Sequence, residues 1–401
     1  MHPSWREAAT VVCTLALAAW QPAVALAQQN PTFRSGVEVI AIDVSVVDKG
    51  HAPVGGLTAD EFVVSVDRRP RKVVSAQFVR YDVRRTVTSG AAATPPTAGA
   101  VAADAAPGFT PARNVLIVVD TDSMDPGYGL LVRREAERFI EGLAPNDRVG
   151  VVTIPRMKSE VTLTKARAQA KRALADVITG AARYRSPRYR IGLYEAFEAE
   201  RDPNVLSSIL ARECPSRDAW CRQDASREVE TVRKESYLRG DRSLRALRNL
   251  GFALEKLAGP KTVLLVSGGT PRPDGSPGRW YAPIGDAFAA AEVFLYTMYV
   301  EQPEFGQARY GTSPTGAQDR LVELEGLENA TSAAGGVLVE AIGAWDQYFD
   351  RVLTELAGSY LLGIEVEPAD RDGRPHAVSV RVRRDGVAVR ARANYVIPPG
   401  Q

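Results

Sequence analysis

The chain has little histidine: only His2, His51 and His376 occur among its 401 residues. His51 and His376 lie in stretches with turn composition, and no G-x-S-x-G nucleophile turn is present, so the residues of a Ser-His-Asp hydrolase are missing. The glycine-rich stretch SGGTPRPDG lacks the Lys-Ser/Thr ending of a phosphate-binding P-loop. The sequence therefore argues against a serine hydrolase and against a P-loop nucleotide-binding protein.

An excess of charge of either sign is also missing. The 50 basic and 48 acidic side chains leave a net charge of +2, which gives no reason to expect a nucleic acid or a membrane surface as partner. Long apolar runs are absent after the first 27 residues. Those residues have Arg6, a short apolar stretch and the cleavage pattern Ala25-Leu26-Ala27, which predict an export signal and a periplasmic or secreted mature protein.

Cysteine is scarce as well, with three residues in the chain. Cys13 leaves with the export signal, and Cys214 and Cys221 remain as a pair in an oxidising compartment, where we expect a disulfide. A straight helix would separate their Cα atoms by about 10 Å, beyond the ~7 Å that a disulfide tolerates. We therefore expect a turn or a broken helix between them. Two thiols without a neighbouring histidine do not make a zinc site.

Hydropathy patterning divides the chain into segments. Residues 28–87 and 359–397 alternate apolar and polar side chains, which predicts β-strands, and Asp385-Gly386 indicates a hairpin turn. Residues 88–112 are rich in Ala, Pro, Gly and Thr and read as a flexible linker. Since neither β segment alone buries much core, we expect the two to pair into one β-sandwich-like domain.

Between these segments, residues 113–358 alternate short apolar strands with amphipathic helices. This pattern predicts an α/β fold with a doubly wound, mostly parallel sheet covered on both faces. Residues 202–243 are very polar and read as an insertion. The expected strands are 114–120, 148–155, 160–163, 262–267, 293–300 and 337–340, and the expected helices are 130–143, 166–178, 191–200, 244–257, 284–291, 321–334 and 345–356.

Several stretches resemble a von Willebrand factor type A domain: NVLIVVDTDSMD, DRVGVVTIP, IGLYEAF and KTVLLVSGG, in this order. The β segments around them are similar to those of exported bacterial proteins that carry a related domain. The resemblance covers nearly all of the mature chain. It implies a protein-binding or scaffolding function, with another protein as partner, and no catalysis.

The resemblance also implies where a divalent cation would bind. Asp120 matches the first ligand of the D-x-S-x-S motif, Asp122 stands at the first Ser, and Met124 or, with a one-residue deletion, Ser123 stands at the second. The second-loop Thr falls on Ile191 and the third-loop Asp on Gly268, which supply no side-chain oxygen. We therefore expect no cofactor, with Mg²⁺ held weakly at most by Asp120, Asp122 and Ser123. The favoured alternative is that these residues cap the following turn and helix.

A second class of protein has related motifs. VVDTDSM and VLLVSG resemble the first two motifs of haloacid dehalogenase-like phosphatases, which would make Asp120 a nucleophile and Asp122 a general acid/base with Mg²⁺. Such an enzyme needs a further strand that ends in carboxylates. The later strands supply only Glu301 or Glu340 there, so this alternative is less well supported.

The expected binding surface is the crevice at the carboxyl ends of the parallel strands, because ligands of open α/β sheets bind there. We also expect Arg188 and Arg190 to neutralise Asp120 and Asp122 by direct pairing. The residues expected at this crevice are Asp120, Asp122, Ser123, Asp125, Arg188, Arg190, Ser267 and Thr270.

Overall fold

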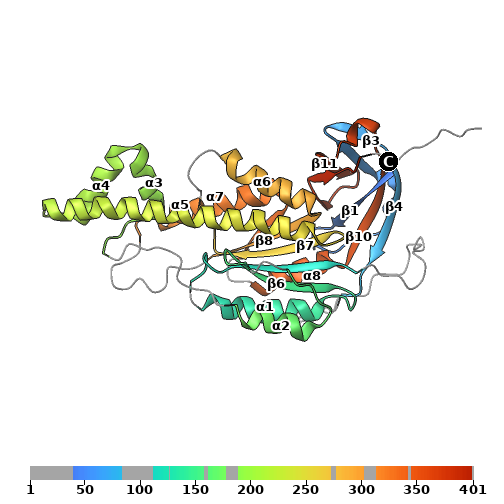
Figure 1. Cartoon of the computed structure of the whole chain (residues 1–401), viewed down its shortest axis with the longest axis horizontal. Coiled ribbons are helices and arrows are strands. Elements are labelled where there is room, and N and C mark those ends of the chain that lie inside the picture. Colours follow the sequence, from blue (N-terminus) through green and yellow to red (C-terminus); the bar gives the residue numbers. More distant parts are fainter. Residues whose placement is uncertain are drawn as a thin grey trace, which may run out of the picture. The chain divides into compact units, whose positions relative to one another are not determined.

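The fold is described from a computed structural model (Figure 1). The expected export signal, residues 1–27, and nearly all of the expected linker, residues 88–112, lie outside the described residues. The structure describes residues 39–83, 112–125, 127–157, 161–177, 188–271, 277–301, 313–341 and 345–399.

The centre of the molecule is a five-stranded sheet in which every strand pair is parallel. The strand order is β6-β5-β7-β8-β9, so the chain adds β6 on one side of β5 and then crosses to β7 on the other. This crossing creates a switch point between β5 and β7, as in doubly wound folds. The expectation of a mixed α/β fold with a parallel sheet is confirmed. The strands are β5 (Asn114–Asp120), β6 (Arg148–Ile154), β7 (Lys261–Ser267), β8 (Val293–Val300) and β9 (Val337–Ala341).

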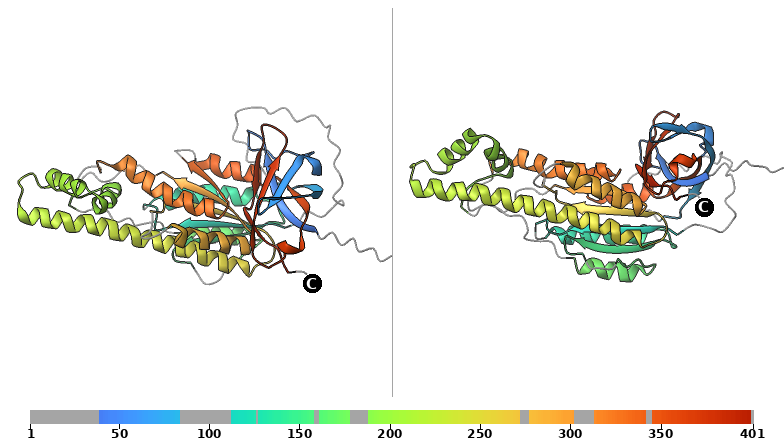
Figure 2. Two further views of the ribbon diagram at one scale, coloured as in Figure 1. Left: turned by 90° about the horizontal axis from the view of Figure 1, so that it is seen from above. Right: turned by 45° about the horizontal axis from the view of Figure 1, so that its top comes forward.

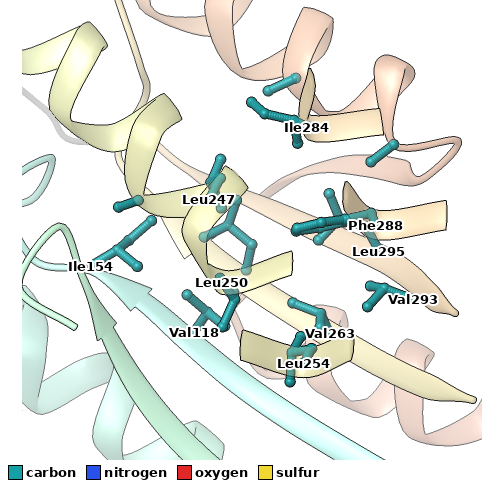
Figure 3. Packing of buried hydrophobic residues seen from close by; sticks show 14 of the residues in the cluster. Val118, Ile154, Leu247, Leu250, Leu254, Val263, Ile284, Phe288, Val293 and Leu295 are labelled. Atoms are coloured by element: carbon teal, nitrogen blue, oxygen red, sulfur yellow. The ribbon is translucent and has the colours of Figure 1, made fainter. Parts of the chain in front are cut away.

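Helices cover both faces of this sheet. All residues of β5 are buried, and successive side chains point to opposite faces. Ile117 packs with helices α1 (Tyr128–Gly142), α2 (Arg167–Ala175) and α8 (Trp345–Glu355). Val118 packs on the other face with α5 (Ala219–Glu255), α6 (Pro277–Ala290) and α7 (Gly316–Ala333), as Figure 3 shows. The two-sided burial explains why the strand sequences read as continuous apolar runs.

Two element predictions differ from the structure. The helix expected at 244–257 is the last part of α5, which begins at Ala219 and so runs through the stretch read as an insertion. Buried residues from Ala225 to Leu254 continue one helical stripe in α5, but the many charged residues on its other faces obscure this stripe in the sequence. The strand expected at 160–163 is wrong for its described residues, because only an isolated bridge between Val149 and Thr164 forms there.

Two shorter helices accompany the first half of α5. Helix α3 (Leu193–Arg201) and helix α4 (Pro203–Glu213) both pack against α5, as the two views of Figure 2 show. Their contact is a small apolar cluster that includes Ala196, Ile209 and Val229. No helix in the described part of the chain is long and apolar enough to cross a membrane.

The terminal β segments combine into two antiparallel sheets, and each sheet takes strands from both ends of the chain. The orders are β12-β1-β10-β4 and β13-β11-β2-β3. The expected pairing of N- and C-terminal strands is therefore confirmed. The strands are β1 (Val39–Val47), β2 (Phe62–Val66), β3 (Arg69–Arg71), β4 (Val73–Arg80), β10 (Gly358–Glu365), β11 (Pro375–Val382), β12 (Ala388–Ala391) and β13 (Asn394–Val396).

One buried cluster holds the two antiparallel sheets together, and Tyr360 is its largest fully buried side chain. The Tyr360 hydroxyl accepts a hydrogen bond from the Leu57 amide and donates one to the Val54 carbonyl, both at 2.9 Å. A polar atom in an apolar cluster is tolerated when its hydrogen bonds are made. Thr58–Glu61 forms a capped helical turn, since Glu61 accepts from the Thr58 amide.

Candidate functional site

The candidate site lies at the carboxyl ends of β5 and β7, on either side of the switch point. Asp120 ends β5 and Ser267 ends β7, and both are buried. The segment after β5 brings Ser123 into contact with Ser267, and Asp122 lies close enough to Asp120 to affect its pKa. The structure thus brings together Asp120, Asp122, Ser123 and Ser267 at this edge of the sheet.

Hydrogen bonds join the ends of β5 and β7 directly. The Ser267 hydroxyl donates to Asp120 Oδ2 at 3.1 Å, and the Ser123 hydroxyl donates to the Asp120 carbonyl at 2.8 Å. Ser123 Oγ also accepts from the Gly268 amide at 2.8 Å. A third hydroxyl, Ser243 of α5, lies 3.5 Å from Asp120 Oδ2. These contacts fix the two strand ends relative to each other and surround Asp120 with hydroxyl groups.

Asp120 is an unusual carboxylate, because only 1% of its surface is exposed. Burial raises its pKa from 3.8 to about 6, against the opposing effects of the Ser267 hydrogen bond and the positive charge of Arg239. Asp122 adds a smaller electrostatic effect that raises the same pKa. Within the described residues, Asp120 Oδ1 has no hydrogen-bond partner. A buried carboxylate with one unsatisfied oxygen at a switch point is a candidate binding group.

Arginines supply the positive charge of this site, but they are not the arginines expected from the sequence. Arg156, just after β6, lies 3.2 Å from the Asp122 carboxylate. Arg239 of α5 is buried and pairs with Glu323 of α7 at 2.7 Å. The Nε atom of Arg239 has no partner among the described residues. Three carboxylates, Asp120, Asp122 and Glu323, therefore lie near two guanidinium groups, and each guanidinium is paired with a carboxylate other than Asp120.

Arg188 and Arg190 have different partners from those expected. Arg188 pairs with Asp224 at 2.9 Å, and Arg190 Nε lies 3.7 Å from Glu213. The prediction that both neutralise Asp120 and Asp122 is replaced by pairing with α4 and α5. The reason is that α4 and α5 carry their own carboxylates next to the segment before α3. Residues 202–243 were interpreted from the sequence as a separate insertion, so Glu213 and Asp224 were not expected as partners.

Several residues of the site were missed in the sequence. Ser243, Arg239 and Glu323 reach it from α5 and α7, and Arg156 reaches it from the end of β6. The missed signal for Arg156 was positional, since it directly follows a predicted strand of the same sheet. To predict Arg239 and Ser243 as site residues, one would have to recognise that a single buried helical stripe continues through the polar stretch before residue 244.

Thr270 and Asp125 differ in exposure. Thr270 is buried, and its amide donates to the Glu323 carbonyl at 2.9 Å. Asp125 is partly exposed, and its carbonyl accepts from the Tyr128 amide at 3.3 Å at the start of α1. Of the two residues, Asp125 is therefore the one that solvent can reach.

The residues at this site do not fit a divalent cation. Ser123 Oγ is already engaged with the Asp120 carbonyl and the Gly268 amide. Met124 is buried in the hydrophobic cluster under α1, so it does not face the crevice. Among the described residues there is no group of three His, Cys, Asp or Glu side chains that could hold a metal ion. The guanidinium groups of Arg156 and Arg239 further oppose a second positive charge.

The geometry also bears on the phosphatase alternative. A general acid/base at Asp122 would need a mobile proton, but this carboxylate is paired with Arg156. The carboxylate that follows β8, Glu301, pairs with Arg320 at 2.6 Å. These ion pairs occupy two of the carboxylates that the alternative needs for catalysis and for Mg²⁺.

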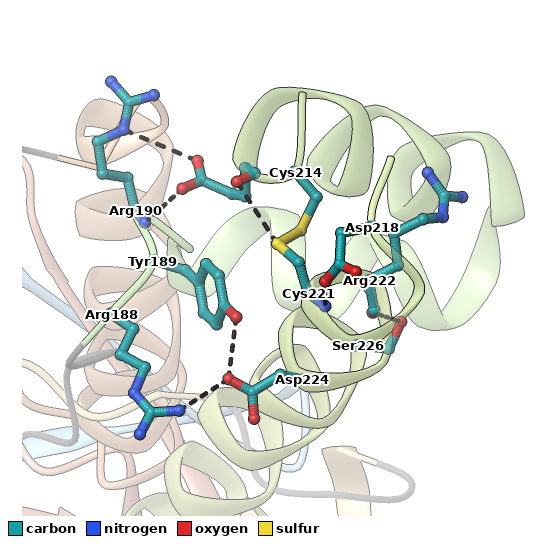
Figure 4. Close-up of a disulfide and its surroundings, with 10 residues drawn as sticks. Arg188, Tyr189, Arg190, Cys214, Asp218, Cys221, Arg222, Asp224 and Ser226 are labelled. Carbon is teal, nitrogen blue, oxygen red and sulfur yellow. Dashed lines mark hydrogen bonds and ion pairs between the residues drawn. A yellow bond between two sulfur atoms is a disulfide. The ribbon is translucent and has the colours of Figure 1, made fainter. Parts of the chain in front are cut away.

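The expected disulfide is confirmed (Figure 4). It joins Cys214, just after α4, to Cys221 in the first turn of α5, with Cα atoms 5.9 Å apart. The chain turns between the two helices, as the distance argument required, and Asp218 caps α5 by accepting from the Cys221 amide at 2.7 Å. Tyr189 lies nearby, and its hydroxyl donates to the Asp224 carboxylate at 2.9 Å.

Comparison with known proteins adds no family assignment to this description. A scan against protein-family models and a search of curated proteins find no match for the chain. The site must therefore be interpreted from its own residues and from the parallel sheet that carries them.

Proposed function

We propose that the chain is an exported, non-catalytic protein that binds another protein through a von Willebrand factor A-like α/β domain. The binding surface is the crevice above β5 and β7. The observation that carries the proposal is the buried Asp120 with an unsatisfied oxygen, set at the switch point where ligands of parallel sheets bind. The hydroxyl groups of Ser123, Ser243 and Ser267 support it, because they can rearrange to meet an incoming polar group.

In this proposal Arg156 has the role that the divalent cation has in the metal-binding sites of von Willebrand factor type A domains. Arg156 is suited to meet a partner, since its side chain is 79% exposed while the Asp122 carboxylate that it contacts is 7% exposed. A partner carboxylate reaching the crevice would pair with Arg156 in a bidentate manner, which a planar guanidinium favours. Binding is then independent of divalent cations.

Site-specific photocrosslinking in the native host tests the proposal. A photoreactive side chain at Asp125, which is partly exposed, is expected to give a protein adduct that forms equally with and without a chelator. Arg156→Glu should reduce this adduct strongly, because it reverses the charge offered to the partner. The matched control places the same photoreactive side chain at Arg227, an exposed position in the first half of α5. An adduct that needs a divalent cation, or that persists with Arg156→Glu, would contradict the proposal.

Two solution assays separate the alternatives. Calorimetry with Mg²⁺, Mn²⁺ and Ca²⁺ is expected to give no saturable binding, and sub-millimolar binding that is lost with Asp120→Ala would establish a cation-dependent adhesion module instead. A generic phosphomonoester is expected to remain intact. Turnover that depends on Asp120 would establish the phosphatase.

A further inference from the structure

A second candidate site lies between α5 and α6, outside the crevice described above. It is a cavity of about 170 Å³ lined by Leu244, Arg245, Arg248, Arg279, Trp280 and Pro283. This volume far exceeds the roughly 15 Å³ that one buried water molecule needs. The two helices lie side by side (Figure 1), and Gly251 allows this because a Cβ there would lie 2.7 Å from the Ala287 Cβ.

The cavity concentrates positive charge. Arg245 is balanced by Asp241, with Nε 2.7 Å from the carboxylate. Arg248 and Arg279 have no acidic side chain within 4.0 Å in the part of the chain that the structure describes. Asp286, the only acidic residue of α6, is exposed and does not line the cavity. Three guanidinium groups thus face one carboxylate.

One polar atom in the cavity wall is left unsatisfied. Arg248 Nε is buried and, among the described residues, has no hydrogen-bond partner. An unmet donor on a charged group costs more than the loss of one ordinary hydrogen bond, so its persistence calls for a compensating partner. An anion in the cavity would provide that partner.

Trp280 holds the arginine side chains in place. The guanidinium carbon atoms of Arg245 and Arg279 lie 5.5 Å and 5.4 Å from the centre of its ring, within the range of cation–π attraction. Arg279 and Trp280 also belong to the first turn of α6, where the helix dipole favours negative charge. Arg245 and Arg279 are therefore positioned by Trp280 before any ligand binds.

We propose that Arg245, Arg248 and Arg279 form a binding site for an oxyanion, that is, a phosphate, sulfate or carboxylate group. Guanidinium groups match such groups because two parallel N–H donors meet two oxygens. The site is separate from the crevice and does not depend on the function proposed for it. A ligand bound here would supply the acceptor that Arg248 lacks.

Calorimetric titration of the mature protein with sodium phosphate, sodium sulfate and sodium citrate tests this site and identifies the preferred oxyanion. We expect saturable binding of at least one of the three. Arg248→Ala and Arg279→Ala should each weaken it about tenfold or more, the loss expected for a hydrogen bond to a charged group. Arg227→Ala removes the same charge from a position about 27 Å along α5 from Arg245. This distance exceeds the ~8 Å screening length, so the variant should leave binding unchanged.

Folding of the variants is checked by circular dichroism, and Arg248→Lys provides a second test. Lysine keeps the charge but not the planar pair of donors, so binding should also weaken with this variant. Asp120→Ala should bind the oxyanion as the wild type does, which separates this site from the crevice. The proposal is wrong if none of the three anions binds saturably, or if Arg248→Ala and Arg248→Lys bind like the wild type.

Discussion

At the scale of single residues, Asp120 determines the behaviour of the crevice. Its carboxylate is buried and held by hydroxyl groups, while the nearest positive charge that lowers its pKa, Arg239, is paired with Glu323. The folded protein therefore carries a negative charge at a cost in stability. Buried charged groups that lower the stability of the folded protein are typical of functional sites.

Asp120→Asn should make the protein more stable at neutral pH. The raised pKa means that folding takes up a proton between pH 3.8 and about 6, so the contribution of Asp120 to stability is full below pH 3.8 and is lost as the pH rises through this window. One pKa unit corresponds to about 1.4 kcal/mol, so the gain on neutralisation is up to about 3 kcal/mol above pH 6. Urea unfolding of both proteins from pH 4 to pH 8 measures it.

The control for this experiment is Asp286→Asn, which removes the same charge from an exposed position in α6. Its effect should be small and should not grow between pH 4 and pH 6. If Asp120→Asn were less stable than the wild type at pH 7, the carboxylate would be stabilising, and the interpretation of Asp120 as a binding group held at a cost would fail.

At the scale of elements, close approach of backbones shapes the crevice. Gly326 of α7 packs directly against the segment after β7, and a Cβ added there would overlap the Thr270 carbonyl oxygen. The added Cβ and the Thr270 carbonyl oxygen are both bonded directly to the main chain, so a change of side-chain rotamer cannot relieve the overlap. The position of Thr270 thus depends on the absence of a side chain in α7.

Gly326→Ala is expected to destabilise the protein by about 1–3 kcal/mol, because overpacking forces the backbone to move, although alanine favours a helix more than glycine does. Differential scanning fluorimetry should show a lower melting temperature. Gly278→Ala is the matched control, since a Cβ there meets nothing within 4 Å. An unchanged or higher melting temperature for Gly326→Ala would mean that α7 and the Thr270 segment are not packed as described.

The disulfide acts on the connection of α4 to α5. Replacing both Cys214 and Cys221 by alanine should lower stability by about 2–3 kcal/mol, the entropic contribution of so short a closed loop. Amide hydrogen exchange should become faster in α4 and the start of α5 and stay slow in β5. Wild-type protein with a reduced disulfide should behave in the same way, and equal exchange in all three samples would show that the disulfide adds no constraint.

How much the sequence predicts follows from the range of the contacts involved. The parallel strands and α1 were predictable because their apolar pattern is local, and the apolar face of α1, with Val132 and Phe139, is buried. Asp120 and Ser267 were predictable because strand ends of a parallel sheet share one edge. The partners Arg239 and Glu323 were not, since their ion pair joins α5 to α7 and so depends on how helices distant in the sequence pack on the sheet. Helix–helix register leaves little trace in a single sequence.

At the scale of the whole molecule, the two ends of the chain depend on each other. Strand β1 pairs with β10 on one side and β12 on the other, and β2 pairs with β11. Their common core combines residues such as Ile42 and Leu362. By contrast, the fully buried residues of the clusters on both faces of the parallel sheet all lie between positions 115 and 353, with the partly buried Val83 and Leu356 packed against them.

A chain that ends at Ala357 should therefore fold only in part. Residues 39–83 lose every partner that the C-terminal strands supply, so β1 and β4 are left unpaired and only β2 and β3 stay paired. A single two-stranded pair buries too little core to be stable alone. The region 112–357 should keep its structure. Limited proteolysis with mass spectrometry is expected to release fragments of residues 39–83 from the shortened chain and not from the full one. Protection of residues 39–83 in the shortened chain would contradict this.

The same pairing sets an order of events during synthesis. The Leu57 amide can form its hydrogen bond to the Tyr360 hydroxyl only after Tyr360, which is 303 residues later in the chain, has been synthesised. At about 5–20 residues per second, translation takes roughly 15–60 s to cover this distance. During that time β1 to β4 have open edges and exposed apolar faces, which other chains can pair with. Correct folding of the first-made strands therefore requires that something occupy or shield them until the last ones arrive.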